Sequence, residues 1–326
     1  MNTETKMPNR DAQLEHWLKD QLNLPADAIT PASADASFRR YFRLTNSGLS
    51  YILMDAPPDK EDCHPFVAIA RQLRAHNIHV PHIIHTDFEH GFLLLSDLGD
   101  RQFLQVVNED NSDTLYKTAI DSLLAIQQVD ANDLPNYSEQ LLRDELALFT
   151  DWFLAIECQL TRSKESQQNW QQLCDQLVTR ALNQPKTFVH RDYHSRNLLL
   201  DSTDTLGIID FQDAVNGPAS YDLVSLLKDC YIRWPEEQLH TWANYYFERS
   251  KLYSDYEQFI TDMDWMGLQR HLKAIGIFAR LKHRDNKPNY LLDIPRTLKY
   301  VRETCNKYPQ LSPLNQLLDT LPNHYQ

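Results

Sequence analysis

The feature that most constrains this chain is a polar loop enclosed by two short apolar runs, within residues 188 to 200. Apolar residues at 188–189 and 198–200 flank the loop, and a third apolar run follows at 206–209. Short apolar runs bounded by polar turns are typical of buried strands. The segment therefore predicts a small group of strands that presents three polar side chains at its loop ends: Asp192, Asn197 and Asp210.

These three side chains have the chemistry that phosphoryl transfer requires. Asp192 carries a carboxylate that can orient a hydroxyl group and take its proton, so it is the predicted catalytic base. Asn197 supplies an amide oxygen and Asp210 a carboxylate oxygen, and both are hard ligands that suit Mg²⁺. Waters and nucleotide phosphates would complete the coordination. The motif therefore predicts a kinase that uses ATP and Mg²⁺.

Length and composition limit the other possibilities. A chain of 326 residues exceeds the usual size of a single core, so we expect two lobes. Five scattered cysteines without a Cys-x-x-Cys pair indicate free thiols and a cytoplasmic location. The polar N-terminus and a mean hydropathy of -0.53 argue against a membrane span. The net charge of -13 argues against nucleic-acid partners and against binding to anionic membranes.

Periodicity predicts a mixed N-terminal lobe and a mostly helical remainder. We expect an N-terminal nucleotide-binding lobe at 1–96, a hinge at 97–100 and a C-terminal catalytic and acceptor-binding lobe at 101–326. Apart from one leading helix near residues 11–22, the first lobe should hold strands at 28–33, 38–45, 50–54, 83–88 and 91–95, with one helix at 64–76. The expected helices of the second lobe are 112–128, 139–159, 166–182, 221–231, 236–250, 256–283 and 312–320.

Longer motifs support a named resemblance. The loop His190-Arg-Asp-Tyr-His-Ser-Arg-Asn197, the run Ile209-Asp-Phe-Gln-Asp213 and the stretch Pro218-Ala-Ser-Tyr-Asp-Leu223 resemble the aminoglycoside phosphotransferase and choline kinase family. The resemblance covers residues 28 to 300. It implies an α+β, protein-kinase-like bilobal fold, with an antiparallel sheet in the small N-terminal lobe and a larger, mostly helical C-terminal lobe. ATP would lie under a β-hairpin, and helices of the C-terminal lobe would hold the acceptor.

A narrower resemblance rests on four other segments. These are ADASFRRYFRL at 34–44, MDAPP at 54–58, LSDLGD at 95–100 and GIFARL at 276–281. They are similar to bacterial sugar kinases that phosphorylate the anomeric hydroxyl of N-acetylmuramate and N-acetylglucosamine in cell-wall recycling. This resemblance implies an amino sugar as the small-molecule acceptor.

The nucleotide side departs from the usual kinase pattern. The turn that should cover the phosphates carries Ala34, Ala36 and Ser37 in place of glycines, and Met54 stands where a strand lysine is expected. The helix at 64–76 also lacks a glutamate to pair with such a lysine. On the second strand, alternation puts Arg39 and Arg43 on one face and Arg40 on the other, so one face should look into the ATP cleft. The candidate nucleotide-binding residues are Ala36, Ser37, Phe38, Arg39, Arg40, Arg43, Ser96, Asp97 and Leu98.

The acceptor side has a weaker signal. Arg280 and Arg284 lie one helical turn apart, and either guanidinium could clamp the carboxylate of an acidic sugar such as N-acetylmuramate. His190 is expected to support the loop through backbone hydrogen bonds, and Asp222 to cap the following helix and to steady the loop. The candidate acceptor-binding residues are Arg191, His194, Arg196, Asp213, Arg280 and Arg284.

Two alternative functions stay open. A choline, ethanolamine or aminoglycoside kinase would bind a cationic acceptor, which the net acidity of the chain permits. A pseudokinase or nucleotide-sensing module would explain the missing strand lysine and the glycine-poor turn. The presence of a base and two metal ligands favours an active kinase.

Overall fold

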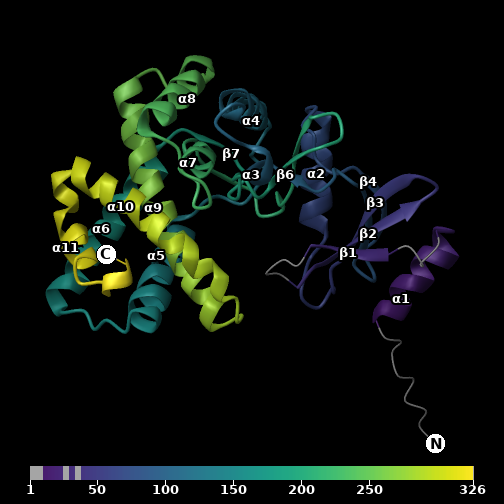
Figure 1. Ribbon diagram of the computed structural model, residues 1–326, viewed down its shortest axis with the longest axis horizontal. Coiled ribbons are helices and arrows are strands. Elements are labelled where there is room, and N and C mark those ends of the chain that lie inside the picture. Colours follow the sequence, from purple (N-terminus) through teal and green to yellow (C-terminus); the bar gives the residue numbers. More distant parts are fainter. Residues whose placement is uncertain (1–9, 25–28, 34–37, 326) are drawn as a thin grey trace, which may run out of the picture.

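The N-terminal lobe is built on one antiparallel sheet. The computed structural model describes residues 10–24, 29–33 and 38–325, and Figure 1 shows the sheet at one end of the molecule and most helices at the other. The sheet has five strands in the order β1-β2-β3-β5-β4. All five confirm the predicted strands to within two residues at each described end: β1 (Ile29–Ser33), β2 (Arg40–Asn46), β3 (Leu49–Asp55), β4 (Ile83–Asp87) and β5 (Phe92–Ser96). The predicted turn at 34–37 lies outside the described residues.

Helices pack on the two faces of this sheet. Apolar side chains of α1 (Arg10–His16) and the π-helical turn η1 (Trp17–Gln21) contact one face, where Leu53 is buried. The helix α2 (His64–Ala75) packs on the other face, where Met54 is buried. Because successive side chains of a strand point to opposite faces, β3 serves both layers. Met54 therefore lies on the side of the sheet that faces the rest of the chain.

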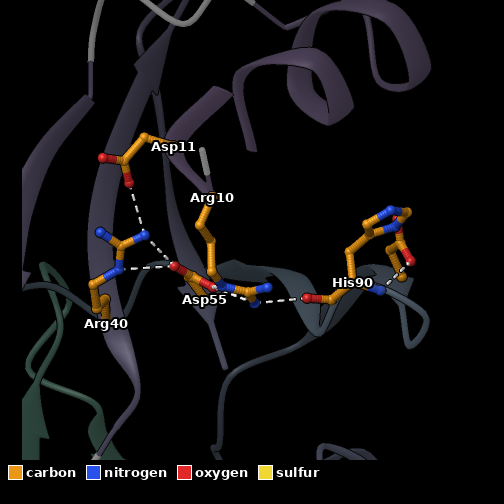
Figure 2. A network of polar contacts seen from close by, with 6 residues as sticks. Arg10, Asp11, Arg40, Asp55 and His90 are labelled. Atoms are coloured by element: carbon orange, nitrogen blue, oxygen red, sulfur yellow. Dashed lines mark hydrogen bonds and ion pairs between the residues drawn. The ribbon is translucent and has the colours of Figure 1, made fainter. Parts of the chain in front are cut away.

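A buried carboxylate attaches α1 to the sheet, as Figure 2 shows. Asp55 is 0% exposed and accepts hydrogen bonds from Arg10 Nε at 2.6 Å and Arg40 Nε at 2.8 Å. Arg40 also reaches Asp11 of α1 at 2.8 Å, and Arg10 donates to the carbonyl oxygen of His90 at 2.6 Å. Two guanidinium groups thus neutralise Asp55, which is how a carboxylate is tolerated in a core.

The C-terminal lobe is mostly helical. Its two small strand groups are β10-β7 and β6-β8-β9. The predicted helices are present, although the one expected at 139–159 continues from α5 into a π-helical stretch, η2, and the one expected at 221–231 ends at residue 227. The helices α3 and α10 were not predicted. The elements are β6 (Arg101–Gln102), α3 (Phe103–Val106), α4 (Ser112–Ile126), α5 (Glu139–Leu148), η2 (Phe149–Glu157), α6 (Lys164–Asn183), β7 (Lys186–Val189), β8 (Leu198–Leu200), β9 (Leu206–Ile208), β10 (Val215–Pro218), α7 (Tyr221–Leu227), α8 (Glu236–Arg249), α9 (Tyr256–His283), η3 (Pro288–Asp293), α10 (Ile294–Lys307), η4 (Pro309–Leu311), α11 (Ser312–Leu318) and η5 (Asn323–Tyr325).

The central element of this lobe is the long helix α9, which is largely buried and packs against α5, α6, α7 and α10. Gly276 sets its distance from the junction of α5 and η2. A Cβ added there would lie 2.3 Å from the carbonyl carbon of Leu148, so the two backbones can approach this closely only at a glycine. Within the described residues, no helix is long and apolar enough to cross a membrane.

A single apolar core joins the two lobes. The cluster that contains Met54 and Phe66 of the N-terminal lobe also contains Phe211 and Leu223 of the C-terminal lobe. The rings of Phe66 and Phe211 lie 4.9 Å apart between centroids. Phe211 directly follows Asp210, so the predicted metal ligand is anchored in the core that both lobes share.

Burial of His271 in α9 gives the stability of the fold a pH dependence. Its Nε2 lies 2.8 Å from the carbonyl oxygen of Lys228, and burial, reinforced by Arg270, lowers the pKa of the imidazole to about 3. The ordinary pKa of histidine is about 6.5, so the unfolded chain binds this proton more readily. The stabilisation is therefore complete above about pH 6.5 and is lost as pH falls towards the folded-state pKa.

We expect His271→Gln to weaken this dependence, because an amide can donate to the same carbonyl and does not titrate. Between pH 7 and pH 4.5 the free energy of unfolding of the variant should fall by roughly 2 kcal/mol less than that of the parent protein. Urea unfolding at the two pH values measures the difference. Equal losses in both proteins would contradict the assignment to His271.

Candidate active site

The predicted catalytic residues come together at the ends of β7, β8 and β9. Asn197 Nδ2 donates to the backbone carbonyl of Asp192 at 3.0 Å and to Asp210 Oδ2 at 3.1 Å. Gln212 Nε2 donates to the other oxygen of Asp210 at 2.8 Å. Because Asn197 uses its amide nitrogen in both bonds, its amide oxygen is the atom that can take a cation.

The backbone at Asp210 favours this arrangement. Its φ of +68° is left-handed, a conformation that aspartate and asparagine adopt more readily than most other residues. The turn after β9 thereby directs the carboxylate back towards Asn197. The pair presents one neutral and one anionic oxygen, a donor set that fits Mg²⁺ alongside nucleotide phosphates and waters.

The electrostatic surroundings keep Asp192 ionised. Burial by itself would raise the pKa of this carboxyl, but the positive charges of Lys273 and Arg191 oppose burial, and the net effect lowers the pKa. His190 contributes as a neutral ring, because burial lowers its pKa to about 4. Its Nδ1 accepts the backbone N–H of Asp192 at 3.3 Å, which confirms the predicted supporting role.

Two buried carboxylates accept hydrogen bonds from the backbone of the catalytic loop, residues 190–197. Asp222, in the first turn of α7, accepts the backbone N–H groups of His190 at 2.6 Å and Arg191 at 3.0 Å, which confirms that it steadies the loop. The predicted cap at Asp222 is wrong, because α7 begins at Tyr221 and Ser220 occupies the N-cap position. Burial raises the pKa of Asp222 to about 7, although these two bonds oppose the shift. Asp229 accepts the N–H of Ser195 at 2.9 Å. The loop backbone is therefore fixed at both ends.

A buried ionic cluster, which no sequence motif indicated, lies beside the catalytic base. Glu145 of α5 accepts hydrogen bonds from Arg191 at 2.7 Å and from Gln269 at 3.0 Å, and it also pairs with Lys273 at 3.0 Å. The hydroxyl of Tyr137 donates to the same carboxylate. Burial favours the neutral acid, but Lys273 and Arg191 lower the pKa of Glu145 below its usual range. The cluster connects α5, the catalytic loop and α9.

This cluster determines where Arg191 points. Arg191 has a φ of +74°, a left-handed conformation that favours glycine, and its guanidinium binds Glu145 and lies 3.4 Å from the carbonyl oxygen of Asp213. The side chain predicted to touch the acceptor is therefore directed into the ionic cluster. Asp213 itself is exposed, and its carboxylate lies 3.5 Å from Gln212 Nε2.

The three arginines predicted to grip the nucleotide have different surroundings. Arg39 Nη2 lies 2.8 Å from Glu61, and Arg43 Nε lies 2.6 Å from Asp97. Arg40 binds Asp55 on the opposite face, as strand alternation predicts (Figure 2). Its prediction as a nucleotide-binding residue needs correcting, because the guanidinium of Arg40 is bound to Asp55 and to Asp11 of α1.

Three of the remaining nucleotide candidates, Ser96, Asp97 and Leu98, lie near the connection between the lobes. Ser96 accepts the N–H of His82 at 2.8 Å, and Asp97 accepts the N–H of Gly99 at 2.8 Å. Leu98 is buried and packs on Gly207, where a Cβ would approach it to 2.8 Å. Phe38 is 64% exposed. Ala36 and Ser37 lie outside the described residues.

Two acceptor candidates of the catalytic loop, Arg196 and His194, pack against the aromatic ring of Tyr231. The guanidinium carbon of Arg196 lies 3.7 Å from the ring centroid of Tyr231, and the ring of His194 meets Tyr231 edge-on at 5.2 Å. Immediately after α9, Arg284 pairs with Asp285 at 2.9 Å. Arg280 is different, because its Nε is buried without a hydrogen-bond partner among the described residues.

Comparison with known proteins agrees with this geometry. The model of the phosphotransferase enzyme family matches residues 28–259. Curated proteins named N-acetylmuramate/N-acetylglucosamine kinase from Pseudomonas aeruginosa and Neisseria meningitidis are 45% and 40% identical to this chain. The alignments cover 96% and 95% of this chain and 97% and 95% of the two relatives.

Solved structures agree on the fold. Spectinomycin phosphotransferase in complex with ADP and spectinomycin has a TM-score of 0.68 at 13% identity, with 91% of this chain and 99% of that chain covered. Ethanolamine kinase from Plasmodium vivax has a TM-score of 0.63 at 12% identity, with 93% and 92% covered. These likenesses confirm the expected protein-kinase-like bilobal fold. The family match and the near full-length relatives show that this chain belongs to the phosphotransferase enzyme family.

Proposed function

We propose that this phosphotransferase is an ATP- and Mg²⁺-dependent kinase that phosphorylates the anomeric hydroxyl of N-acetylmuramate or N-acetylglucosamine. The observation that carries the proposal is the convergence of Asp192, Asn197 and Asp210, whose hydrogen bonds join base and metal ligands in one site. The choice of acceptor is supported by relatives with that name, which are 40% and 45% identical over almost the whole chain. The five cysteines, all buried and unpaired, support a cytoplasmic location.

In this proposal, Asp192 positions the acceptor hydroxyl and takes its proton. The acceptor oxygen forms a bond to the γ-phosphorus while the bond between that phosphorus and the β,γ-bridging oxygen breaks, and ADP leaves. The lowered pKa of Asp192 supports its role as a proton acceptor at neutral pH. Asn197 and Asp210 would hold Mg²⁺ through their side-chain oxygens, and the ion would neutralise phosphate charge.

The nucleotide would enter between the sheet and the catalytic loop. Residues 97–100 are proposed as the hinge, and Ser96, Asp97 and Leu98 would lie beside the adenine ring of the nucleotide. Arg43, Ser50 and Gly99 all donate to the carboxylate of Asp97, which supports a fixed shape for this segment. Gly99 has a φ of +87°, so the chain can turn sharply there towards the second lobe.

Arg280 is proposed to bind the carboxylate of N-acetylmuramate. It lies seven residues after Lys273 on α9, so helical periodicity puts it two turns farther along the face that borders Asp192. Burial and the neighbouring Arg284 lower the pKa of Arg280, whereas Asp285 only partly opposes them. A half-buried guanidinium whose Nε has no hydrogen-bond partner among the described residues favours a negatively charged ligand.

Arg280→Ala should therefore discriminate between the two sugars. We expect the KM for N-acetylmuramate to rise by about 10- to 100-fold and that for N-acetylglucosamine, which lacks the carboxylate, to change by less than about 3-fold. Arg284→Ala is the matched comparison, because its guanidinium is already bound to Asp285. Unchanged turnover of both sugars in Arg280→Ala would remove Arg280 from the acceptor site.

The function itself is tested by a panel of acceptors. Purified protein with ATP and Mg²⁺ should release ADP in the presence of N-acetylmuramate or N-acetylglucosamine and not with choline, homoserine or kanamycin. Phosphorus NMR of the product should show an anomeric phosphate. An ester at another position would reject the anomeric assignment, and binding of Mg·ATP without turnover of any acceptor would favour a nucleotide-sensing module.

A further inference from the structure

The position that usually carries a phosphate-binding lysine is apolar in this chain. In protein kinases, a lysine on the third strand pairs with a glutamate of the adjacent helix and reaches the nucleotide phosphates. Here Met54 of β3 faces α2 and is fully buried in the core that joins the lobes. The helix α2 contains no glutamate. A cation for the phosphates must therefore come from another element of the N-terminal lobe.

Arg39 provides such a cation on the same side of the sheet. It immediately precedes β2, and Tyr41, two residues later, pairs with Met54 across the strands. Because side chains two residues apart share a face in extended chain, Arg39 faces the side of Met54. Its Nη2 lies 2.8 Å from Glu61 Oε2, and the two side chains are only 11% and 16% exposed. This ion pair is largely withdrawn from solvent, unlike most surface pairs.

Glu61 is held in place by the turn that leads into α2. Its backbone N–H and that of Lys60 both donate to the carbonyl oxygen of Pro57, each at 2.9 Å. Next to it, Asp62 accepts the N–H of His64 at 2.9 Å, which fixes the start of the helix. The carboxylate that orients Arg39 thus belongs to a hydrogen-bonded turn rather than to the helix itself.

The charge of Arg39 interacts with carboxylates of the candidate active site. Burial by itself would lower its pKa, but the negative charges of Glu61, Asp213 and Asp210 are among those that raise it. The nucleotide phosphates would then lie between the guanidinium of Arg39 in the N-terminal lobe and the Asn197–Asp210 pair in the C-terminal lobe. A guanidinium carries five N–H donors in a planar fork, so it can hold Glu61 and bind a phosphate at the same time.

We propose that Arg39, oriented by Glu61, binds the phosphate oxygens of the nucleotide and replaces the strand lysine and helix glutamate of other kinases. The inference rests on the proposed use of ATP and is independent of the acceptor. It assigns a role to Glu61, which no motif of the sequence suggested. It also separates Arg39 from Arg40 and Arg43, whose guanidinium groups bind Asp55 and Asp97.

The test is binding of Mg·ATP and of adenosine to the full-length protein, measured calorimetrically without any acceptor. For Arg39→Met we expect the Kd of Mg·ATP to rise by about 10- to 100-fold, the cost of losing a charge-assisted contact. The Kd of adenosine, which has no phosphates, should change by less than about 2-fold. Arg39→Lys keeps the charge without the fork and should fall between parent and Arg39→Met.

Glu61→Gln tests whether Glu61 orients Arg39, because it leaves the positive charge of Arg39 in place. It should weaken Mg·ATP binding by about 3- to 10-fold in the parent protein and add nothing in Arg39→Met, because the two residues act as one unit. Arg71→Gln, on the exposed face of α2, controls for the loss of a surface charge and should bind both ligands as the parent does. Thermal unfolding of each variant verifies that the fold is kept.

Two results would overturn the inference: unchanged Mg·ATP affinity in Arg39→Met, or equal weakening of Mg·ATP and adenosine binding. Neither depends on which acceptor is phosphorylated. If no sugar is turned over but Arg39→Met still loses Mg·ATP selectively, the proposed acceptor is wrong and the role of Arg39 holds. If sugars are phosphorylated and Arg39→Met binds Mg·ATP as tightly as the parent, the proposed acceptor holds and the role of Arg39 is wrong.

Discussion

Asp192→Asn is expected to lower kcat by about 10²- to 10⁴-fold, the range for loss of a positioned base. An amide has nearly the shape of the carboxylate but cannot take the proton of the acceptor hydroxyl. The Kd of Mg·ATP should stay within about 3-fold of the parent value, because the proposed phosphate and metal contacts come from other residues. Steady-state kinetics with N-acetylglucosamine and calorimetry with Mg·ATP give the two quantities.

Asp204→Asn is the matched control for this substitution. Asp204 lies in the turn between β8 and β9, where its exposed carboxylate pairs with Arg101. The same change of chemistry there should leave kcat within about 2-fold of the parent. If Asp192→Asn retained more than about a tenth of the parental kcat, a base at this position would be excluded.

The pH profile offers a second view of Asp192. Burial would raise the pKa of the Asp192 carboxyl, but nearby charges, Lys273 first among them, lower it overall. Asp192 is therefore ionised at every pH above the ordinary pKa of an aspartate. The acidic limb of kcat/KM should accordingly lie below about pH 4. Lys273→Met removes the charge that counters burial and should move that limb to higher pH.

Glu145→Gln is expected to destabilise the protein by about 3–5 kcal/mol, the usual consequence of leaving buried charges without their partner. Arg191 and Lys273 would remain inside the protein without the carboxylate that neutralises both. Because domains are stable by only about 5–15 kcal/mol, the loss should be large in urea unfolding. Activity should also fall, since the cluster supports the residue next to Asp192.

The control for Glu145→Gln lies on the same helix. Glu139 is exposed and pairs with Arg143 at 2.9 Å, so Glu139→Gln should change stability by less than about 1 kcal/mol. The pH dependence has a definite sign. The pKa of Glu145 is lowered in the folded protein, so its stabilisation is present above the unfolded value and is lost as pH falls through the folded value. Equal stability of the two variants would show that the cluster is not a source of stability.

The sequence predicted the parts of the site that follow from local chemistry. Asp192, Asn197 and Asp210 are recognisable because a short loop and a short strand fix their separation, so spacing along the chain reflects distance in space. Strand alternation also separated Arg39 from Arg40, because side-chain direction in a strand is a local property. It could not reveal that Arg40 and Asp55 would lie opposite each other, since that contact depends on the register between β2 and β3.

The residues that were missed are defined by tertiary contacts. Glu145, Gln269 and Lys273 are separated from Arg191 by dozens of residues and meet it only when α5 and α9 pack on the catalytic loop. No local pattern distinguishes them from exposed charges. For α10 a signal existed, because Pro295 marks a helix start and Ile294, Leu298, Val301 and Cys305 recur at helical spacing.

The apolar core that joins the lobes has a consequence for how this protein unfolds. Met54 and Phe66 lose their partners if Phe211 and Leu223 are exposed, so neither lobe can melt while the other keeps its packing intact. A single cooperative transition is the thermodynamic counterpart of that shared cluster. Wide movement of one lobe away from the other is opposed by the hydrophobic effect, because it would bring water onto the rings of Phe66 and Phe211.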